Sequence, residues 1–173
     1  VDGDAVFGDA AVDSVTGLTT LEVTGAATIN ADTVSSADAQ TYTGAVTLGN
    51  STTLTAGNDP VLFSSTVASE ASEANALTVN AGSGAVTFTG AVGGGVNGEL
   101  GDLAVNSTGV TQFQSAVTAA SVVTNVGGTV EINGGAVTTS GVQTYGENAT
   151  LGADTNLQGT TVTFSGTLNS AED

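Results

Sequence analysis

Apolar and polar residues alternate along this chain in short runs. Val46-Thr47-Leu48 and Val86-Thr87-Phe88 show the pattern, in which a threonine separates two larger apolar residues. A period of two places the apolar side chains on one face of a β-strand and the hydroxyls on the other. Further apolar pairs occur at Leu21/Val23, Thr28/Ile29, Leu77/Val79, Leu103/Val105 and Val130/Ile132. Because helical spacings of three and four are missing, the pattern predicts an all-β protein.

The predicted strands follow one another closely, and each is followed by Gly, Asn, Asp or Ser. Three strand steps cover 19 residues from Val23 to Tyr42 (42 − 23) and 21 residues from Tyr42 to Phe63 (63 − 42). This rhythm predicts a parallel β-helix (β-solenoid) with three faces and coils of about 20 residues. About eight coils would fit in the 173 residues and stack to roughly 40 Å at the usual strand spacing. Stacked coils bury apolar residues that no single coil can bury alone.

The chain also repeats itself over a longer distance. The stretch from Ile29 to Gly49 aligns without a gap to the stretch from Ile132 to Gly152, at an offset of 103 residues (132 − 29), with nine of 21 positions identical. The repeat predicts that residues 1–173 form one repetitive region. Five coils of about 20 residues would fill the offset.

A second motif, V-x-F-x-x-x-V, places phenylalanine in one recurring context. It occurs, with variants, as Val61-Phe63-Val67, Val86-Phe88-Val92, Thr111-Phe113-Val117, Val162-Phe164-Leu168 and, more loosely, Val6-Phe7. A phenylalanine that recurs in register indicates that one structural position is refilled along the chain.

Other stretches interrupt the strand rhythm. Asn58-Asp59-Pro60, Gly93-Gly94-Gly95 and Gly127-Gly128 are typical of corners or longer loops. The stretch from Ser69 to Asn75 predicts an excursion from the coil, for which a short helical turn is one possible form.

Charge excludes several classes of function. The chain has no Lys, Arg or His and 17 Asp plus Glu, which gives a net charge of −17. Such a chain cannot neutralise nucleic-acid phosphates, and it is repelled by anionic membrane surfaces. No apolar run is long enough to span a bilayer, and no Cys is present. Catalytic triads, thiolates, Schiff bases and phosphate clamps all need residues that are missing, and no acid pair recurs in the repeat, so we expect no enzyme and assign no catalytic, cofactor or metal residue.

Weaker motifs leave alternatives open. The acids Asp2, Asp4, Asp9 and Asp13 are the densest cluster, which is consistent with Ca²⁺ binding or with solvated corners, although no EF-hand or nonapeptide calcium repeat is present. Calcium is thus the only cofactor suggested. Acceptor motifs for glycosylation begin at Asn50, Asn106 and Asn148. Outward threonine pairs, which an ice-binding face would need once per coil, occur irregularly at Thr41/Thr43, Thr53/Thr55, Thr87/Thr89 and Thr161/Thr163.

Three segments carry a resemblance to a known family. They are ALTVNAGSGAVTFTGAVGG (76–94), GGAVTTSGVQTYGENATLGADTNLQ (134–158) and VTFSGTL (162–168). Their repeat style resembles the filamentous-haemagglutinin type and related bacterial β-strand-repeat surface adhesins. The resemblance implies export, a parallel β-helix, and a role in adhesion, biofilm or surface scaffolding. The lack of basic residues departs from that family and suggests a saline or cation-rich setting.

The sequence therefore predicts a structural protein of the cell surface, either a segment of an adhesin shaft or the subunit of a filament. A calcium-stabilised S-layer or matrix protein is the first alternative, and a polysaccharide- or ice-binding solenoid is the second. The chain begins and ends within the strand rhythm without an obvious cap. The expected partner is accordingly another copy, stacked end to end, or further coils of a longer chain.

Overall fold

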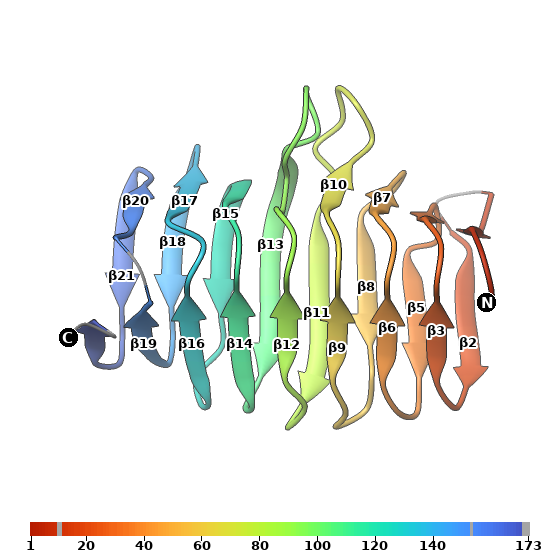
Figure 1. Ribbon diagram of the computed structural model, residues 1–173, viewed down its shortest axis with the longest axis horizontal. Helices are drawn as coiled ribbons and strands as arrows, with labels where there is room; N and C mark the ends of the chain where they lie inside the picture. Colours follow the sequence, from red (N-terminus) through yellow and green to blue (C-terminus); the bar gives the residue numbers. More distant parts are fainter. Residues whose placement is uncertain (10–11, 153, 171–173) are drawn as a thin grey trace.

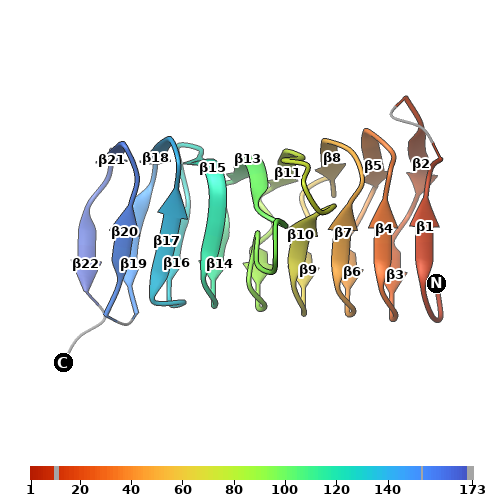
Figure 2. The same ribbon diagram turned by 90° about the horizontal axis from the view of Figure 1, so that it is seen from above.

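The fold is a parallel β-solenoid of about eight coils, as predicted. The computed structural model describes residues 1–9, 12–152 and 154–170, in which 22 short strands and no helix are found. Figures 1 and 2 show the coils stacked along the longest axis of the molecule, with the two termini at opposite ends. None of the described residues forms a helix that is long and apolar enough to cross a membrane.

Each coil contributes to three faces, and strands on one face pair in parallel with those of the coils before and after. The first face, seen in Figure 2, consists of β1 (Ala5–Phe7), β4 (Ala27–Ile29), β7 (Val46–Leu48), β10 (Val67–Ser69), the start of β15 (Val117–Thr124), β17 (Ala136–Thr139) and β20 (Asn156–Gln158). Between β10 and β15, this face continues only through isolated bridges at Val92. The second face consists of β2 (Ser14–Leu18), β5 (Thr33–Ser36), β8 (Thr52–Thr55), β11 (Leu77–Gly82), β13 (Leu100–Ser107), the end of β15, β18 (Val142–Tyr145) and β21 (Thr161–Phe164). The third face consists of β3 (Leu21–Val23), β6 (Gln40–Tyr42), β9 (Val61–Phe63), β12 (Val86–Phe88), β14 (Val110–Phe113), β16 (Thr129–Ile132), β19 (Asn148–Leu151) and β22 (Leu168–Ser170).

Two coils are longer than the others because they carry projecting loops. Paired residues on the third face are 19 positions apart from Leu21 to Gln40, but 25 apart from Val61 to Val86 and again to Thr111. The additional residues lie in loops 70–76 and 93–99, which rise above the body between β10 and β13 in Figure 1. Apart from these two coils, the predicted coil length of about 20 residues is confirmed.

The expected helical turn in the first of these loops is wrong. Glu73 N donates to Glu70 O (3.1 Å), which closes a single turn, but Ser72 has a φ of 69° and its N–H donates to Asn97 O in the neighbouring loop (3.0 Å). A positive φ interrupts a right-handed helix, and the bond to Asn97 replaces the bond that a helix would make. The two loops therefore support each other rather than folding locally.

The core consists of columns of identical or similar side chains that run along the axis. On the third face the rings of Tyr42, Phe63, Phe88 and Phe113 are stacked, with centroids 5.3, 4.9 and 5.3 Å apart. Parallel rings at this separation contribute about 0.5–1.5 kcal/mol per pair beyond the area that they bury. The prediction that one position is refilled by phenylalanine is confirmed for Phe63, Phe88 and Phe113.

Alternation fixes which residues enter this core. Val46 and Leu48 are buried and Thr47 between them is not, as the period of two predicts. The predicted apolar pair Thr28/Ile29 is wrong, because adjacent residues of a strand point to opposite sides. Ala27 and Ile29 are the buried pair of that strand.

The long repeat does not return to the same face. Gln40-Thr41-Tyr42 forms β6 on the third face, whereas Gln143-Thr144-Tyr145 lies in β18 on the second face. The offset of 103 residues therefore covers four coils and two further faces rather than five whole coils. Phe164 shows the same shift, because it stacks on Tyr145 (4.9 Å) in a second aromatic column on the second face.

Both copies nevertheless build the same buried hydrogen-bond network. Gln40 Nε2 donates to Val34 O (3.2 Å) and Thr55 O (2.9 Å), and Tyr42 Oη donates to Gln40 Oε1 (2.9 Å). The second copy repeats this with equal sequence separations: Gln143 Nε2 donates to Val137 O (3.0 Å) and Gln158 O (2.9 Å), and Tyr145 Oη donates to Gln143 Oε1 (3.1 Å). The glutamine joins a strand of its own coil to a strand of the next coil. The conserved spacing within the repeat is therefore structural.

Glycine allows the corners between the third and first faces to stack closely. A Cβ on Gly44 would lie 2.2 Å from the carbonyl oxygen of Gly25, and one on Gly134 would lie 2.1 Å from the carbonyl of Ser115. Any side chain would push the neighbouring coil away, so the corner needs glycine at these points.

Candidate binding groove

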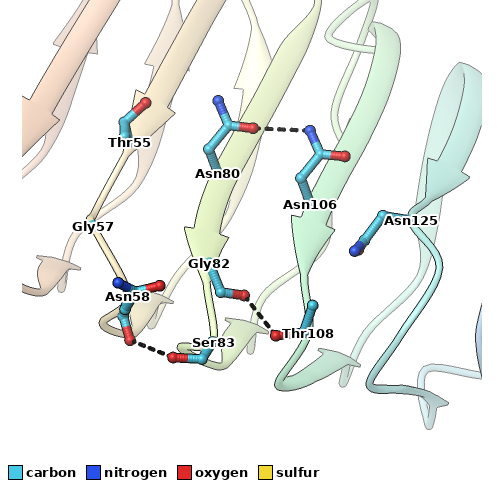
Figure 3. Close-up of a pocket in the computed structure, with 9 residues that line it drawn as sticks. All are labelled: Thr55, Gly57, Asn58, Asn80, Gly82, Ser83, Asn106, Thr108 and Asn125. Atoms are coloured by element: carbon cyan, nitrogen blue, oxygen red, sulfur yellow. Dashed lines mark hydrogen bonds between the residues drawn. The ribbon is translucent and has the colours of Figure 1, made fainter.

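A row of polar side chains crosses the second face. Thr55, Asn80 and Asn106 occupy equivalent outward positions near the ends of β8, β11 and β13. Asn125 follows β15 and takes the next place, because Val105 pairs with Thr124. Figure 3 shows the four side chains side by side on adjacent coils. Neighbouring strands lie about 4.8 Å apart, so the row repeats at roughly that interval along the axis.

Corner residues form the other side of a shallow groove. Its volume is about 510 Å³, and its lining consists of Thr55, Gly57, Asn58, Asn80, Gly82, Ser83, Asn106, Thr108 and Asn125. We call these residues the amide groove. Gly57 and Gly82 have positive φ angles of 56° and 55°, and a Cβ on Gly57 would lie 2.3 Å from Ala37 O. The left-handed corner thus requires glycine, and the missing side chains leave the groove open.

Hydrogen bonds hold part of the row in place. Asn106 Nδ2 donates to Asn80 Oδ1 (2.8 Å), as drawn in Figure 3. Asn125 is fixed at both ends of its amide, because Oδ1 accepts from Ser107 N (2.8 Å) and Nδ2 donates to Val126 O (3.0 Å). The Nδ2 of Asn80, the Oδ1 of Asn106 and the hydroxyl of Thr55 have no partner among the described residues. These donors and acceptors remain available to a ligand.

The groove is neutral on a strongly acidic molecule. None of its nine lining residues is titratable, although the chain carries 17 carboxylates. A site without an ionisable group cannot act as a general acid or base or as a carboxylate nucleophile. The groove can therefore offer a ligand only hydrogen bonds from its own neutral amides, hydroxyls and backbone groups.

A second hollow, of about 350 Å³, lies beside the projecting loops. It is lined by Ala74, Glu99, Leu100, Thr118, Ala119, Ala120, Thr138, Thr139 and Ser140. Small side chains dominate this lining, and Glu99 is its one charged residue. The hollow offers few groups that could fix the orientation of a ligand.

One carboxylate enters the core at a corner. Glu147 is only 3% exposed; its Oε2 accepts a hydrogen bond from Thr124 Oγ1 (2.7 Å), and its Oε1 has no partner within the described residues. Burial raises the pKa of Glu147, and the bond from Thr124 opposes the rise only in part. No Lys, Arg or His exists in the chain to pair with it. Glu147 is two residues after Tyr145 and four after Gln143, and both of these side chains are buried. A period of two therefore predicts from the sequence that Glu147 also points inward.

The acids at the start of the chain mainly cap turns. Asp4 Oδ1 accepts from Ala26 N (2.8 Å), Asp2 Oδ1 accepts from Thr24 Oγ1 (3.2 Å), and Asp13 Oδ2 accepts from Asp9 N (2.8 Å). Across the described ranges, no group of three or more acidic side chains is arranged to hold a metal ion. Calcium binding therefore stays a prediction, and these aspartates serve the first two coils as hydrogen-bond acceptors.

The threonine pairs do not share one side of the solenoid. Thr41 and Thr87 lie on the third face with Leu62 between them, and the pairs at Thr53 and Thr161 lie on the second face. An unbroken array of these pairs is therefore missing from the described strands.

The three possible glycosylation positions differ in their surroundings. Asn106 is exposed within the amide groove, Asn50 is half-buried, and Asn148 is exposed, with its Oδ1 accepting from Thr167 N (2.9 Å). Glycosylation at these positions stays a prediction.

Comparisons of the chain with protein families, with curated proteins and with solved structures find no match. The fold and the amide groove are therefore interpreted from their own geometry.

Proposed function

We propose that this chain is a rod-like structural segment of a bacterial surface fibre, either part of an adhesin shaft or the repeating subunit of a filament. The observation that carries the proposal is the parallel pairing that runs through about eight coils, unbroken on the second and third faces and carried past Val92 by isolated bridges on the first face. Backbone hydrogen bonds that run along the axis, together with stacked core columns, make a solenoid stiff in the direction of its length. A stiff spacer needs no catalytic residue.

The two ends support extension of the rod. In the described coils, β1 pairs only with β4, and β22 pairs only with β19, so one edge of each strand is open. Leu168 in β22 is 48% exposed, although the equivalent Ala149 in the preceding coil is fully buried. Open strand edges pair readily with another strand. Further coils of a longer chain or a second copy would complete both the pairing and the core.

Surface charge supports an extracellular setting. A net charge of −17 without any basic side chain keeps rods apart laterally, and it leaves the acids to be screened by external cations. The filamentous-haemagglutinin-like repeat style adds the proposal of export and adhesion. The calcium-stabilised S-layer or matrix protein remains the second candidate, because the same carboxylates would attract divalent ions.

Electron microscopy of the purified chain, with and without Ca²⁺, tests the proposal. Dispersed rods of roughly 40 Å are expected for a shaft segment, and long uniform fibres are expected for a filament subunit. Ordered two-dimensional arrays that need Ca²⁺ would instead favour the S-layer. Irregular compact particles under both conditions would contradict all three.

A charged edge variant identifies the joint. Leu168→Lys places a charge on the open edge strand β22, which should abolish end-to-end fibres. Thr163→Lys, on an exposed lateral position of β21, is the matched control and should leave fibres intact. Fibres that survive Leu168→Lys but not Thr163→Lys would show lateral assembly instead.

A further inference from the structure

We propose that the amide groove is a binding site for a neutral polysaccharide chain, which would lie along the axis of the solenoid across four coils. This assignment goes beyond the proposed function, since it holds for a shaft segment and for a filament subunit alike. It also concerns a face that a neighbouring coil at either end would leave uncovered, because β8, β11, β13 and β15 lie within the body of the rod.

The chemistry of the lining selects the ligand class. Asparagine amides carry a donor and an acceptor each, and threonine and serine hydroxyls can serve as both. Sugar hydroxyls have the same double capacity, so neutral sugars match a surface on which donors and acceptors alternate. In Figure 3 the free Nδ2 of Asn80 and the free Oδ1 of Asn106 lie on the two outer sides of the pair, and the bond between these two side chains holds both amides in place.

Charge argues against the other ligand classes. An anionic polymer would have to approach a molecule of net charge −17 and would find no cationic partner in the groove. A cation would find carboxylates elsewhere on the surface and only neutral oxygens here. A flat apolar ligand would leave the amides unpaired, at a cost of about 1–3 kcal/mol for each buried group.

The geometry favours a polymer over a single sugar. The row of Thr55, Asn80, Asn106 and Asn125 presents one polar group per coil, at intervals of about 4.8 Å. Each contact is weak because the groove is shallow and has no aromatic residue to stack on a sugar ring. Several contacts of this kind on one chain add up through effective concentration, whereas a monosaccharide engages only one or two.

Nuclear magnetic resonance with isotope-labelled protein tests the site directly. Cellohexaose, a neutral linear glucan, is the probe, and the side-chain amide signals of Asn80 and Asn106 are the readout. We expect both signals to move with a dissociation constant on the order of 0.1–1 mM, and we expect glucose alone to move them little. Polygalacturonate, an acidic polymer, should bind more weakly than cellohexaose.

Two variants make the test specific. Asn80→Ala with Asn106→Ala should weaken cellohexaose binding at least tenfold, and Asn156→Ala, an exposed amide on the first face, should leave it unchanged. Asn106→Asp, which adds a charge with little change of shape, should also weaken binding, and it keeps the test valid if the double variant does not fold. Unmoved Asn80 and Asn106 signals with cellohexaose, stronger binding of polygalacturonate, or equal binding by the variants would each overturn the proposal. That outcome would leave the expected result of the electron microscopy unchanged, so the two proposals fail separately.

Discussion

Glu147→Gln should make this protein more stable at neutral pH and should flatten part of its pH dependence. Glu147 is 3% exposed, and one of its carboxylate oxygens has no hydrogen-bond partner among the described residues. Burial raises the pKa of Glu147 above 4.5, the ordinary value of a glutamate side chain. The folded state therefore holds the proton more tightly than the unfolded state does. The stabilisation is complete below about pH 4.5 and is lost as the pH rises toward the folded pKa.

The size of the effect follows from linkage. While Glu147 stays protonated in the folded chain and ionised in the unfolded chain, each pH unit removes about 1.4 kcal/mol from the free energy of unfolding. Glutamine does not ionise, and its Oε1 can still accept the bond from Thr124. We expect Glu147→Gln to gain stability over the unchanged chain as the pH rises from 4 to 7.5, and each kcal/mol gained would raise the melting temperature of a chain of this size by about 2 to 4 °C.

A matched variant separates this effect from the general repulsion among carboxylates. Glu22→Gln also removes one negative charge, but Glu22 is exposed on the third face. Thermal unfolding followed by circular dichroism between pH 4 and 8 should show a larger gain for Glu147→Gln than for Glu22→Gln. Equal pH profiles for the two variants would refute the reasoning, since Glu147 would then titrate like a surface acid.

Three further predictions follow from the core and the charge. Phe88→Ala opens a gap in the middle of the aromatic column and should lower the free energy of unfolding by about 3–5 kcal/mol, measured with denaturant. Phe164→Ala, in the half-buried last coil, should cost clearly less. Equal losses for the two variants would contradict the role of the column. Gln40→Leu should cost at least about 2 kcal/mol, because it removes both hydrogen bonds of the buried Nε2 and leaves the buried hydroxyl of Tyr42 without its acceptor, and an unchanged midpoint would contradict the network. Raising NaCl from low concentration to about 1 M, or adding Ca²⁺, should raise the melting temperature by screening the 17 carboxylates, and a constant value would show that repulsion is unimportant.

The solenoid could be predicted because large apolar residues, which must be buried, recur once per coil in a similar sequence context. Phe63, Phe88 and Phe113 share one context in sequence and one column in space. The spacing between paired residues varies, however, for example from 19 to 26 residues, because loops 70–76 and 93–99 lengthen two coils. A longer loop leaves the alternation of buried residues within each strand unchanged. The alternation alone therefore cannot show how many strands separate two repeats, or which face a later strand occupies.

The amide groove could not be predicted from the sequence, because the variable loop lengths also make the intervals between its residues irregular. Asn80 and Asn106 are 26 residues apart (106 − 80), and Asn106 and Asn125 are 19 apart (125 − 106), so no constant interval joins them. A local signal was present, because Asn80 and Asn106 each follow an inward valine, Val79 or Val105. The four polar residues at the ends of consecutive second-face strands can be recognised as a row only when the register of those strands is known.

The shift of the long repeat from the third face to the second has a consequence for how such a gene can change. Gln143 and Tyr145 make the bonds of Gln40 and Tyr42 after moving through four coils and two faces. Because the same bonds form on either face, the smallest unit by which this rod could grow is one strand with its corner, a third of a turn, and not a whole turn. Duplication in such steps lengthens the rod by less than a coil at a time. A step of that size also moves every downstream strand to the next face, as the aromatic column moves from the third face, at Tyr42 to Phe113, to the second face, at Tyr145 and Phe164.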